Sequence, residues 1–180
     1  MDRVKQGHSL DRYKRRNPII FLWFGTCDLT KKTQEGFAEL NREDNSIVEK
    51  LTEKYREIVG YLHREGFKPI ILETPYYSIQ FWNSLKGHTN PETFKHSDEQ
   101  LTEQIDTLNK NIEQINTESR VQAPKFNIDF RSVRGKRGKT KYYNNLNSLR
   151  DGIHPGQKLA KAWLKKIVYY ASANSKQDAK

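Results

Sequence analysis

The sequence predicts a single α/β domain in which helices cover both faces of a parallel sheet. Short apolar runs alternate along the chain with longer segments whose apolar residues recur every three or four positions. This alternation, with short connections, is typical of parallel strands joined by right-handed helical crossovers. The first apolar run is continuous, which indicates a strand covered on both faces. At 180 residues the chain has room for one domain with a sizeable core.

Three strands are expected, at residues 19–24, 68–74 and 126–130. Gly25 ends the first strand and Pro75 breaks the second. A polar loop follows the first strand, and an aromatic loop follows the second, containing Tyr76, Tyr77, Phe81 and Trp82. We expect the domain to occupy residues 18–171, after a basic segment at 1–17 and before a polar tail at 172–180.

Three helices are expected between and after these strands. The first begins at Ile47 and stops near Gly66, a residue typical of helix ends. The second follows Ser97, which we expect to cap it, and its stripe is Leu101, Ile105, Leu108, Ile112 and Ile115. The last covers residues 156–170. Such stripes indicate packing against a sheet, because a coiled coil needs more heptads.

The composition restricts the class of protein. The longest apolar run is far shorter than the roughly 20 residues that span a bilayer, so a soluble intracellular protein without membrane contact is expected, cytoplasmic or nuclear. The single cysteine, Cys27, excludes an internal disulfide framework and fits a reducing compartment. No metal and no organic cofactor are predicted. The sequence leaves the oligomeric state open.

The net charge of +10 attracts anions at long range. A basic loop contributes to it, with Arg131, Arg134, Lys136, Arg137, Lys139 and Lys141 set between glycines and followed by Tyr142 and Tyr143. Two interpretations remain open: a solvated loop, or a loop that follows phosphates while its tyrosines stack on bases. Under the second, the chain is a non-catalytic nucleic-acid-binding module, of the kind found in mobile-element or viral polyproteins.

Two polar turns fall where parallel sheets place their functional residues, at the carboxyl ends of strands. Gly25, Thr26, Cys27 and Asp28 follow the first strand, and the second turn is Asp151, Gly152, Ile153, His154 and Pro155. An Asp three residues before a His can orient the imidazole and stabilise its protonated form, so the pair can serve as a general base. The alternative is an Asp that caps the next helix beside a solvated His.

In their order and placement these turns resemble the SGNH, or GDSL-type, hydrolases. The resemblance covers residues 18–170 and implies a flavodoxin-like three-layer α/β/α sandwich that cleaves acyl esters without a cofactor. It implies that His154 is the general base and Asp151 the carboxylate that orients it. It also implies that Gly25, Thr26, Cys27 and Asp28 form the oxyanion-hole region. The expected partner is then an ester substrate or an anionic substrate.

Two departures from the family predict impaired catalysis. Cys27 stands where the family has an oxyanion-hole Asn, and a thiol is a weak donor. The loss of one such donor costs about 3–4 kcal/mol of transition-state stabilisation. The family's Ser nucleophile follows an earlier strand, and no such strand precedes Pro18. Ser9 lies in a Gly-His-Ser-Leu string but too close to Gly25, so we expect a truncated or catalytically impaired hydrolase.

Overall fold

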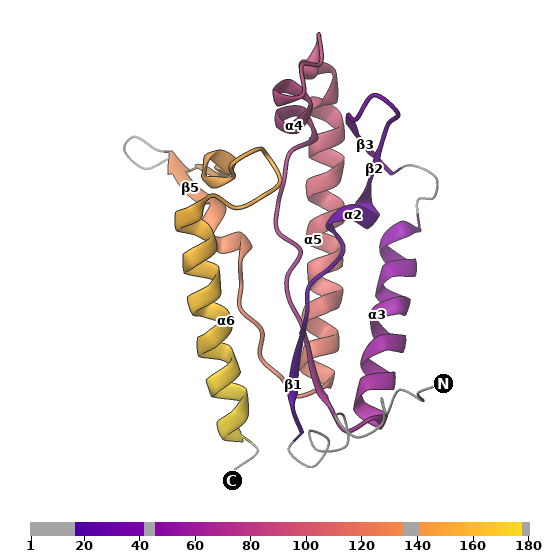
Figure 1. Cartoon of the computed structure of the whole chain (residues 1–180), viewed down its shortest axis with the longest axis vertical. Coiled ribbons are helices and arrows are strands. Elements are labelled where there is room, and N and C mark those ends of the chain that lie inside the picture. The colour runs from indigo at the N-terminus through magenta and orange to yellow at the C-terminus, as the bar shows by residue number, and fades with distance from the viewer. Residues whose placement is uncertain (1–16, 42–45, 135–140, 178–180) are drawn as a thin grey trace, which may run out of the picture.

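The computed structural model describes residues 17–41, 46–134 and 141–177, which form a mixed α/β fold (Figure 1). No helix in these ranges is both long and apolar enough to cross a bilayer. In chain order the elements are β1 (Ile19–Leu22), α2 (Thr26–Leu29), β2 (Thr30–Lys32), β3 (Ala38–Leu40), α3 (Ile47–Arg64), β4 (Lys68–Ile71), α4 (Ile79–Leu85), η1 (Pro91–Phe94), α5 (Lys95–Glu118), η2 (Asn127–Phe130), β5 (Arg131–Arg134), β6 (Lys141–Asn144), η3 (Leu146–Ser148) and α6 (Gln157–Gln177).

β1 and β4 form a parallel pair, as the first two apolar runs predict. Ile19 pairs with Lys68 and Leu22 with Ile71. In Figure 1, α6 lies on one side of this pair, and α3 and α5 lie on the other. The mixed α/β class and the parallel pairing are therefore confirmed, although the parallel sheet has only two strands within the described ranges.

The predicted helices form and supply the core. α3 buries Tyr55 and Val59 and ends before Gly66, whose φ of 79° is the left-handed conformation that stops a helix. α5 buries its whole predicted stripe, Leu101, Ile105, Leu108, Ile112 and Ile115. α6 begins where predicted but continues to Gln177, so residues 172–177 extend the helix.

The third predicted strand, at 126–130, is wrong, because Asn127–Phe130 forms a 3-10 helix instead. The Glu73 carboxylate accepts hydrogen bonds from the backbone N–H groups of Phe126 and Asn127. The Asn127 side chain in turn bonds to the chain beyond β4, where its Oδ1 accepts from the N–H of Tyr76 at 2.9 Å. Side chains thus satisfy backbone groups that a strand ladder would otherwise pair, and the segment curls.

The predicted cap of the second helix is also wrong. α5 begins at Lys95, two residues before Ser97, because the 3-10 turn Pro91–Phe94 runs directly into it. The neighbouring Asp98 caps a different helix: its Oδ1 accepts the N–H of Ile79 at 2.7 Å, at the start of α4. Asp98, which was expected to stabilise the start of α5, therefore caps α4.

Helices and strands also form in segments that were expected to be loops. The polar loop contains the antiparallel pair β2 and β3, and the aromatic loop contains α4, whose cap Ser78 accepts the N–H of Phe81 at 3.0 Å. The basic loop is partly strand, because its two ends pair as β5 and β6. The loop residues between these strands, 135–140, lie outside the described residues.

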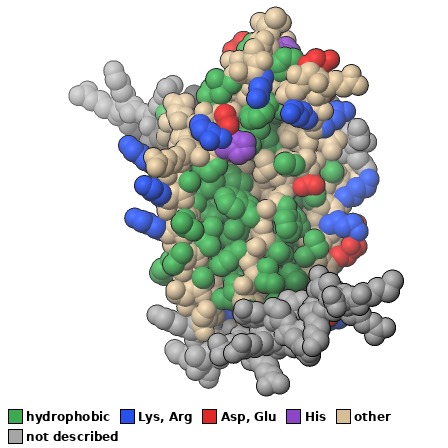
Figure 2. Space-filling model, viewed as in Figure 1, with side chains coloured by type: hydrophobic (Ala, Val, Ile, Leu, Met, Phe, Trp, Pro, Cys, Tyr) green, Lys and Arg blue, Asp and Glu red, His purple; other side chains and the backbone are tan. Residues whose placement is uncertain are grey.

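Some apolar side chains remain on the surface. Figure 2, drawn from the same side as Figure 1, shows them gathered over β1 and between α6 and α3. Trp23 is 42% exposed just after β1, and Leu164 is 61% exposed on α6. In the described part of the chain, the apolar side chains on this face of the fold are therefore not covered by another element.

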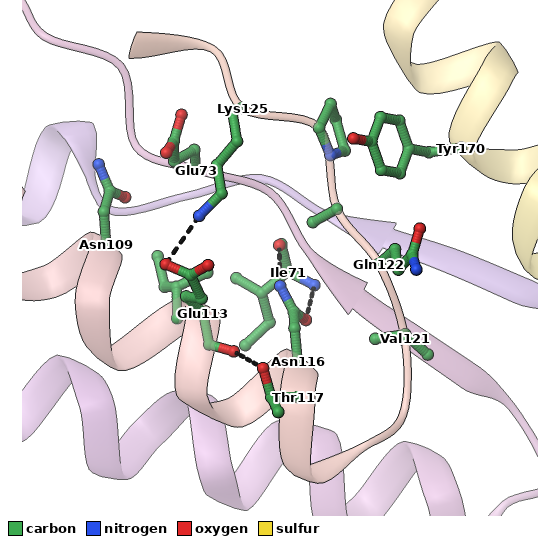
Figure 3. A pocket seen from close by; sticks show the side chains of 13 residues that line it. Ile71, Glu73, Asn109, Glu113, Asn116, Thr117, Val121, Gln122, Lys125 and Tyr170 are labelled. Atoms are coloured by element: carbon green, nitrogen blue, oxygen red, sulfur yellow. Dashed lines mark hydrogen bonds and ion pairs between the residues drawn. The ribbon is translucent and has the colours of Figure 1, made fainter. Parts of the chain in front are cut away.

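Asparagine side chains pair with extended backbone where no strand lies alongside. Asn116 accepts a hydrogen bond from the N–H of Ile71 at 3.0 Å and donates one to its C=O at 2.7 Å (Figure 3). One side-chain amide thus satisfies both backbone groups of a single residue. Asn109 does the same for Thr74, at 2.8 Å each way. The same two-bond pairing joins Asn83 to Ala38 and Asn174 to Gln122. These amides replace the ladder that further strands would supply.

We expect Asn116→Ala to lower the free energy of unfolding by about 2–4 kcal/mol, because it leaves a buried N–H and a buried C=O of Ile71 unpaired. Urea denaturation measures the change. The matched control is Asn111→Ala on the same helix, whose amide bonds only to the Thr52 hydroxyl. The control should cost about 1 kcal/mol or less. Equal losses in the two variants would contradict a structural role for the Asn116 pairing.

Candidate active site

The two polar turns singled out in the sequence meet at one pocket. A cavity of about 480 Å³ lies beyond the carboxyl end of β1. One wall is the Gly25–Asp28 turn and another is Ile153–Pro155. Its remaining lining is apolar: Trp23, Phe24, Pro75 and Trp163. The pocket therefore combines polar groups from both predicted turns with aromatic walls. The sequence analysis did not identify these walls.

The aromatic wall is held by ring packing. The ring centroid of Trp23 lies 5.3 Å from that of Phe126 and 5.8 Å from that of Trp163. Phe126 and Trp163 stack at 4.8 Å, and the Trp163 indole donates to Asp129 at 2.9 Å. α6 is thus fixed to the end of β1 by aromatic contacts. These contacts join residues far apart in the sequence, so they cannot be predicted from each helix or strand by itself.

The first turn is fixed by the carbonyl that precedes it. The C=O of Phe24 accepts two hydrogen bonds, from the Tyr55 hydroxyl at 3.0 Å and from the Thr74 hydroxyl at 3.3 Å. Burial, together with the negative charge of Asp28, raises the pKa of Tyr55 to about 12, so its hydroxyl remains a donor at neutral pH. One bond comes from α3 and the other from the chain after β4, so the end of β1 is tied on two sides.

Gly25 has to be glycine for two reasons. Its φ of 111° is a conformation that L side chains rarely adopt. A Cβ there would also lie 2.7 Å from both the Tyr55 and the Thr74 hydroxyl oxygens. The glycine lets the chain turn sharply into α2 beneath the two hydroxyls. The side chains of Cys27 and Asp28 then lie on the exposed side of the short helix.

The second turn is a compact loop closed at its neck. Leu149 and Pro155 form an isolated bridge, and the N–H of Arg150 donates to the C=O of His154 at 2.7 Å. Gly152 at the tip has a φ of 86°, and its C=O accepts the N–H of Ser78 at 2.8 Å. The start of α4 therefore positions the loop against the rest of the site.

Asp151 and His154 form the hydrogen-bonded pair that their spacing predicts. Asp151 Oδ2 lies 2.8 Å from His154 Nδ1, and Asp151 Oδ1 accepts the N–H groups of His154 at 2.8 Å and Ile153 at 3.2 Å. Burial opposes ionisation of Asp151, but these bonds outweigh it and hold the pKa of the carboxyl well below its usual range. The carboxylate is ionised at neutral pH and orients the imidazole.

This arrangement suits general acid–base chemistry. With Nδ1 held by the carboxylate, His154 Nε2 is the ring nitrogen left for proton transfer. Its side chain is 55% exposed, so a substrate or water can reach it. Of the described residues that line the pocket, only Thr26 and Cys27 carry a hydroxyl or thiol. The pocket has a base and an orienting carboxylate but no serine among these residues.

The other predicted site residues do not join this pocket. Arg131 lines a separate hollow with Glu73 and Asp106. The side chains of Arg134 and Lys141, at the ends of β5 and β6, lie outside the described residues. So do Ser9 and the remaining basic residues of the loop, Lys136, Arg137 and Lys139. Neither the Ser9 nucleophile nor the nucleic-acid-binding loop gains support from the described structure.

A second cavity, of about 220 Å³, lies beside β4 (Figure 3). Several of its polar side chains are already engaged: Asn116 pairs with Ile71, and Lys125 forms an ion pair with Glu113 at 2.8 Å. Within the described ranges no three His, Cys, Asp or Glu side chains are grouped to hold a metal ion. The pocket at His154 is therefore the candidate active site.

No protein-family model matches the sequence, and no curated protein is significantly similar to it. The function has to be argued from the pocket itself.

We expect Gly25→Ala to destabilise the fold more than Gly87→Ala does. Both glycines have positive φ, but a Cβ at Gly87 would meet nothing within 4 Å. The difference between the two losses in unfolding free energy isolates the crowding beneath Tyr55 and Thr74, which we expect to cost about 1–3 kcal/mol. Equal losses would contradict the close approach. Thermal and urea denaturation of both variants supply the measurement.

The lowered pKa of Asp151 predicts how stability depends on pH. Because the folded pKa lies below the unfolded value of about 4, the ionised carboxylate stabilises the fold fully above that pH, and this contribution is lost progressively as the pH falls from there toward the folded pKa. The stability lost in Asp151→Asn, on the order of 1 kcal/mol after solvent screening, should therefore shrink in acid. Urea titrations between neutral and acidic pH test this. A difference that does not change with pH would contradict it.

Proposed function

We propose that the chain is an SGNH-hydrolase-like domain, with the flavodoxin-like layered fold of that family, that binds an acyl ester in the pocket at His154 and hydrolyses it poorly. The single observation that carries the proposal is that His154, which is hydrogen-bonded to Asp151, lines the same pocket as the Gly25–Asp28 turn. The positions of α6 on one side of the parallel pair and of α3 and α5 on the other agree with a layered fold.

In the proposed reaction His154 is the base. Its Nε2 removes a proton from the nucleophile as that nucleophile attacks the ester carbonyl, and the resulting imidazolium is stabilised by ionised Asp151. The same nitrogen then returns the proton to the departing alcohol. The backbone N–H groups of Thr26 and Cys27 begin α2, where helix geometry provides no partner for them, and we assign them to the oxyanion.

Two features support slow turnover. The hydroxyl and thiol among the described lining residues belong to Thr26 and Cys27, on the turn assigned to the oxyanion, so water is the proposed nucleophile. Water attack loses the advantage of a covalent intermediate. Cys27 also replaces the side-chain amide that the resemblance leads us to expect, so the oxyanion has only backbone donors. A general base alone contributes about 10²–10⁴-fold.

The test is hydrolysis of para-nitrophenyl acetate by the whole chain. We expect saturable release of nitrophenol below about 1 s⁻¹, at the low end for enzymes. His154→Ala should remove about nine-tenths or more of this rate, and Asp151→Asn should lower it by disturbing the imidazole. Cys27→Ala is the matched control in the same pocket and should leave the rate unchanged.

Each result bears on a separate part of the proposal. A slow rate that His154→Ala does not change would overturn the role of the pocket. Fast turnover that depends on His154 would overturn the claim of poor activity. Loss of turnover in Cys27→Ala would make the thiol the nucleophile and overturn attack by water.

A further inference from the structure

One edge of β1 has no partner strand within the described ranges. The C=O of Pro18 accepts from Lys68 at 3.0 Å and that of Leu22 from Leu72 at 2.8 Å, so alternate residues of the strand face β4. The backbone groups of the residues between them, Ile19 and Phe21, therefore face the opposite edge. The two N–H and two C=O groups there present a template for another strand.

The outer edge of β4 is closed in two ways that β1 lacks. Pro69 has no N–H to offer, and Asn116 occupies both backbone groups of Ile71. Exposed edges in natural proteins are usually protected by charges, proline or bulges. The run Ile19–Phe24 contains none of these residues, although 30% of the chain is charged. The edge of β1 is therefore unprotected where the edge of β4 is blocked.

The helices on either side of the parallel pair carry exposed apolar side chains. On α6, Leu164 and Val168 lie one turn apart and are 61% and 58% exposed. On α3, Ile58 and Tyr61 are 37% and 55% exposed. Figure 2 shows the apolar surface continuing across β1 between these helices. An added strand would find backbone partners along its length and apolar surfaces for side chains on both of its faces.

The charge of the chain indicates what kind of segment would bind at this edge. Lys161 and Lys165 lie beside the exposed stripe of α6 in helical spacing, and residues 152–177 include no acidic residue. Figure 2 shows Lys and Arg side chains along the outer margins of the apolar surface. A second copy of this chain would bring another net charge of +10 against the first. Charge complementarity therefore favours an acidic partner.

We infer that the open edge of β1 is a docking site for an extended, acidic segment of another polypeptide, which joins the sheet as a strand. Its backbone pairs with Ile19 and Phe21, its apolar side chains pack on the Leu164 and Ile58 flanks, and its acidic residues face the lysines of α6. This is recognition by β-strand addition, in which main-chain bonds supply affinity and side-chain contacts supply specificity.

The test uses fluorescein-labelled peptides in which pairs of valines alternate with pairs of glutamates, so that each face of the strand carries both residue types, with fluorescence anisotropy as the readout. We expect saturable binding by the full chain. Binding should weaken by about tenfold or more for a valine–lysine peptide of equal length, because the charges then repel. A valine–glutamate peptide with alternate amides N-methylated should bind equally weakly, because it cannot pair along one edge.

Protein variants locate the binding. L164S and V168S together, both at exposed positions, should weaken binding of the valine–glutamate peptide by about tenfold, because they remove apolar contact surface without changing the charge. The matched control is L85S on α4, where the leucine is 56% exposed but lies away from β1. The inference is overturned by any of four results: no binding, equal binding of the acidic and basic peptides, equal binding after N-methylation, or no effect of the α6 variant. A chain dimer that the α6 variant dissociates would overturn the choice of an acidic partner.

Discussion

The asparagine side chains that pair with extended backbone are the constraint on which the rest of this fold depends. The parallel sheet has two strands in the described ranges, and two strands alone leave many backbone groups without partners. Beyond β4 the chain runs on through Thr74 to the aromatic segment, and side-chain amides rather than a neighbouring strand hold it. The amides involved along this path are Asn109, Asn116 and Asn127. Because each forms bonds to backbone N–H and C=O groups, it fixes position as well as satisfying burial.

The geometry of the candidate site follows from this arrangement. Thr74, held by Asn109, donates its hydroxyl to the carbonyl of Phe24 and so fixes the turn at Gly25. Further along, Ser78 holds the loop of His154 through the carbonyl of Gly152. Both turns of the pocket are thus held in place by hydrogen bonds from one extended segment, residues 72–78. Asn116 also occupies the outer edge of β4 at Ile71, whereas no strand pairs with the other edge of β1 within the described ranges.

Much of the fold could be predicted from the sequence, because the helices and their ends are specified by residues close together in the chain. The stripe from Leu101 to Ile115 and the stop at Gly66 depend on spacing and on one glycine, and both are confirmed. The third strand could not be predicted correctly, since Phe126 and Phe130 are buried as apolar residues of a strand would be, but the segment is held by Glu73, far away in the sequence. The Asp151–His154 bond was predictable from a spacing of three residues. The aromatic wall of Trp23 and Trp163 was not, because it depends on how α6 packs against β1.

The central claim, that the Cys27 turn and the His154 turn meet at one pocket, can be measured in solution. Cys27 is the only cysteine and is exposed, so a nitroxide attached there is specific. Nuclear magnetic resonance of the labelled chain should show strong paramagnetic broadening of the His154 imidazole signals. The signals of His63, near the far end of α3, should remain sharp in the same sample. An unbroadened His154 imidazole would contradict the shared pocket and, with it, the proposed hydrolase site.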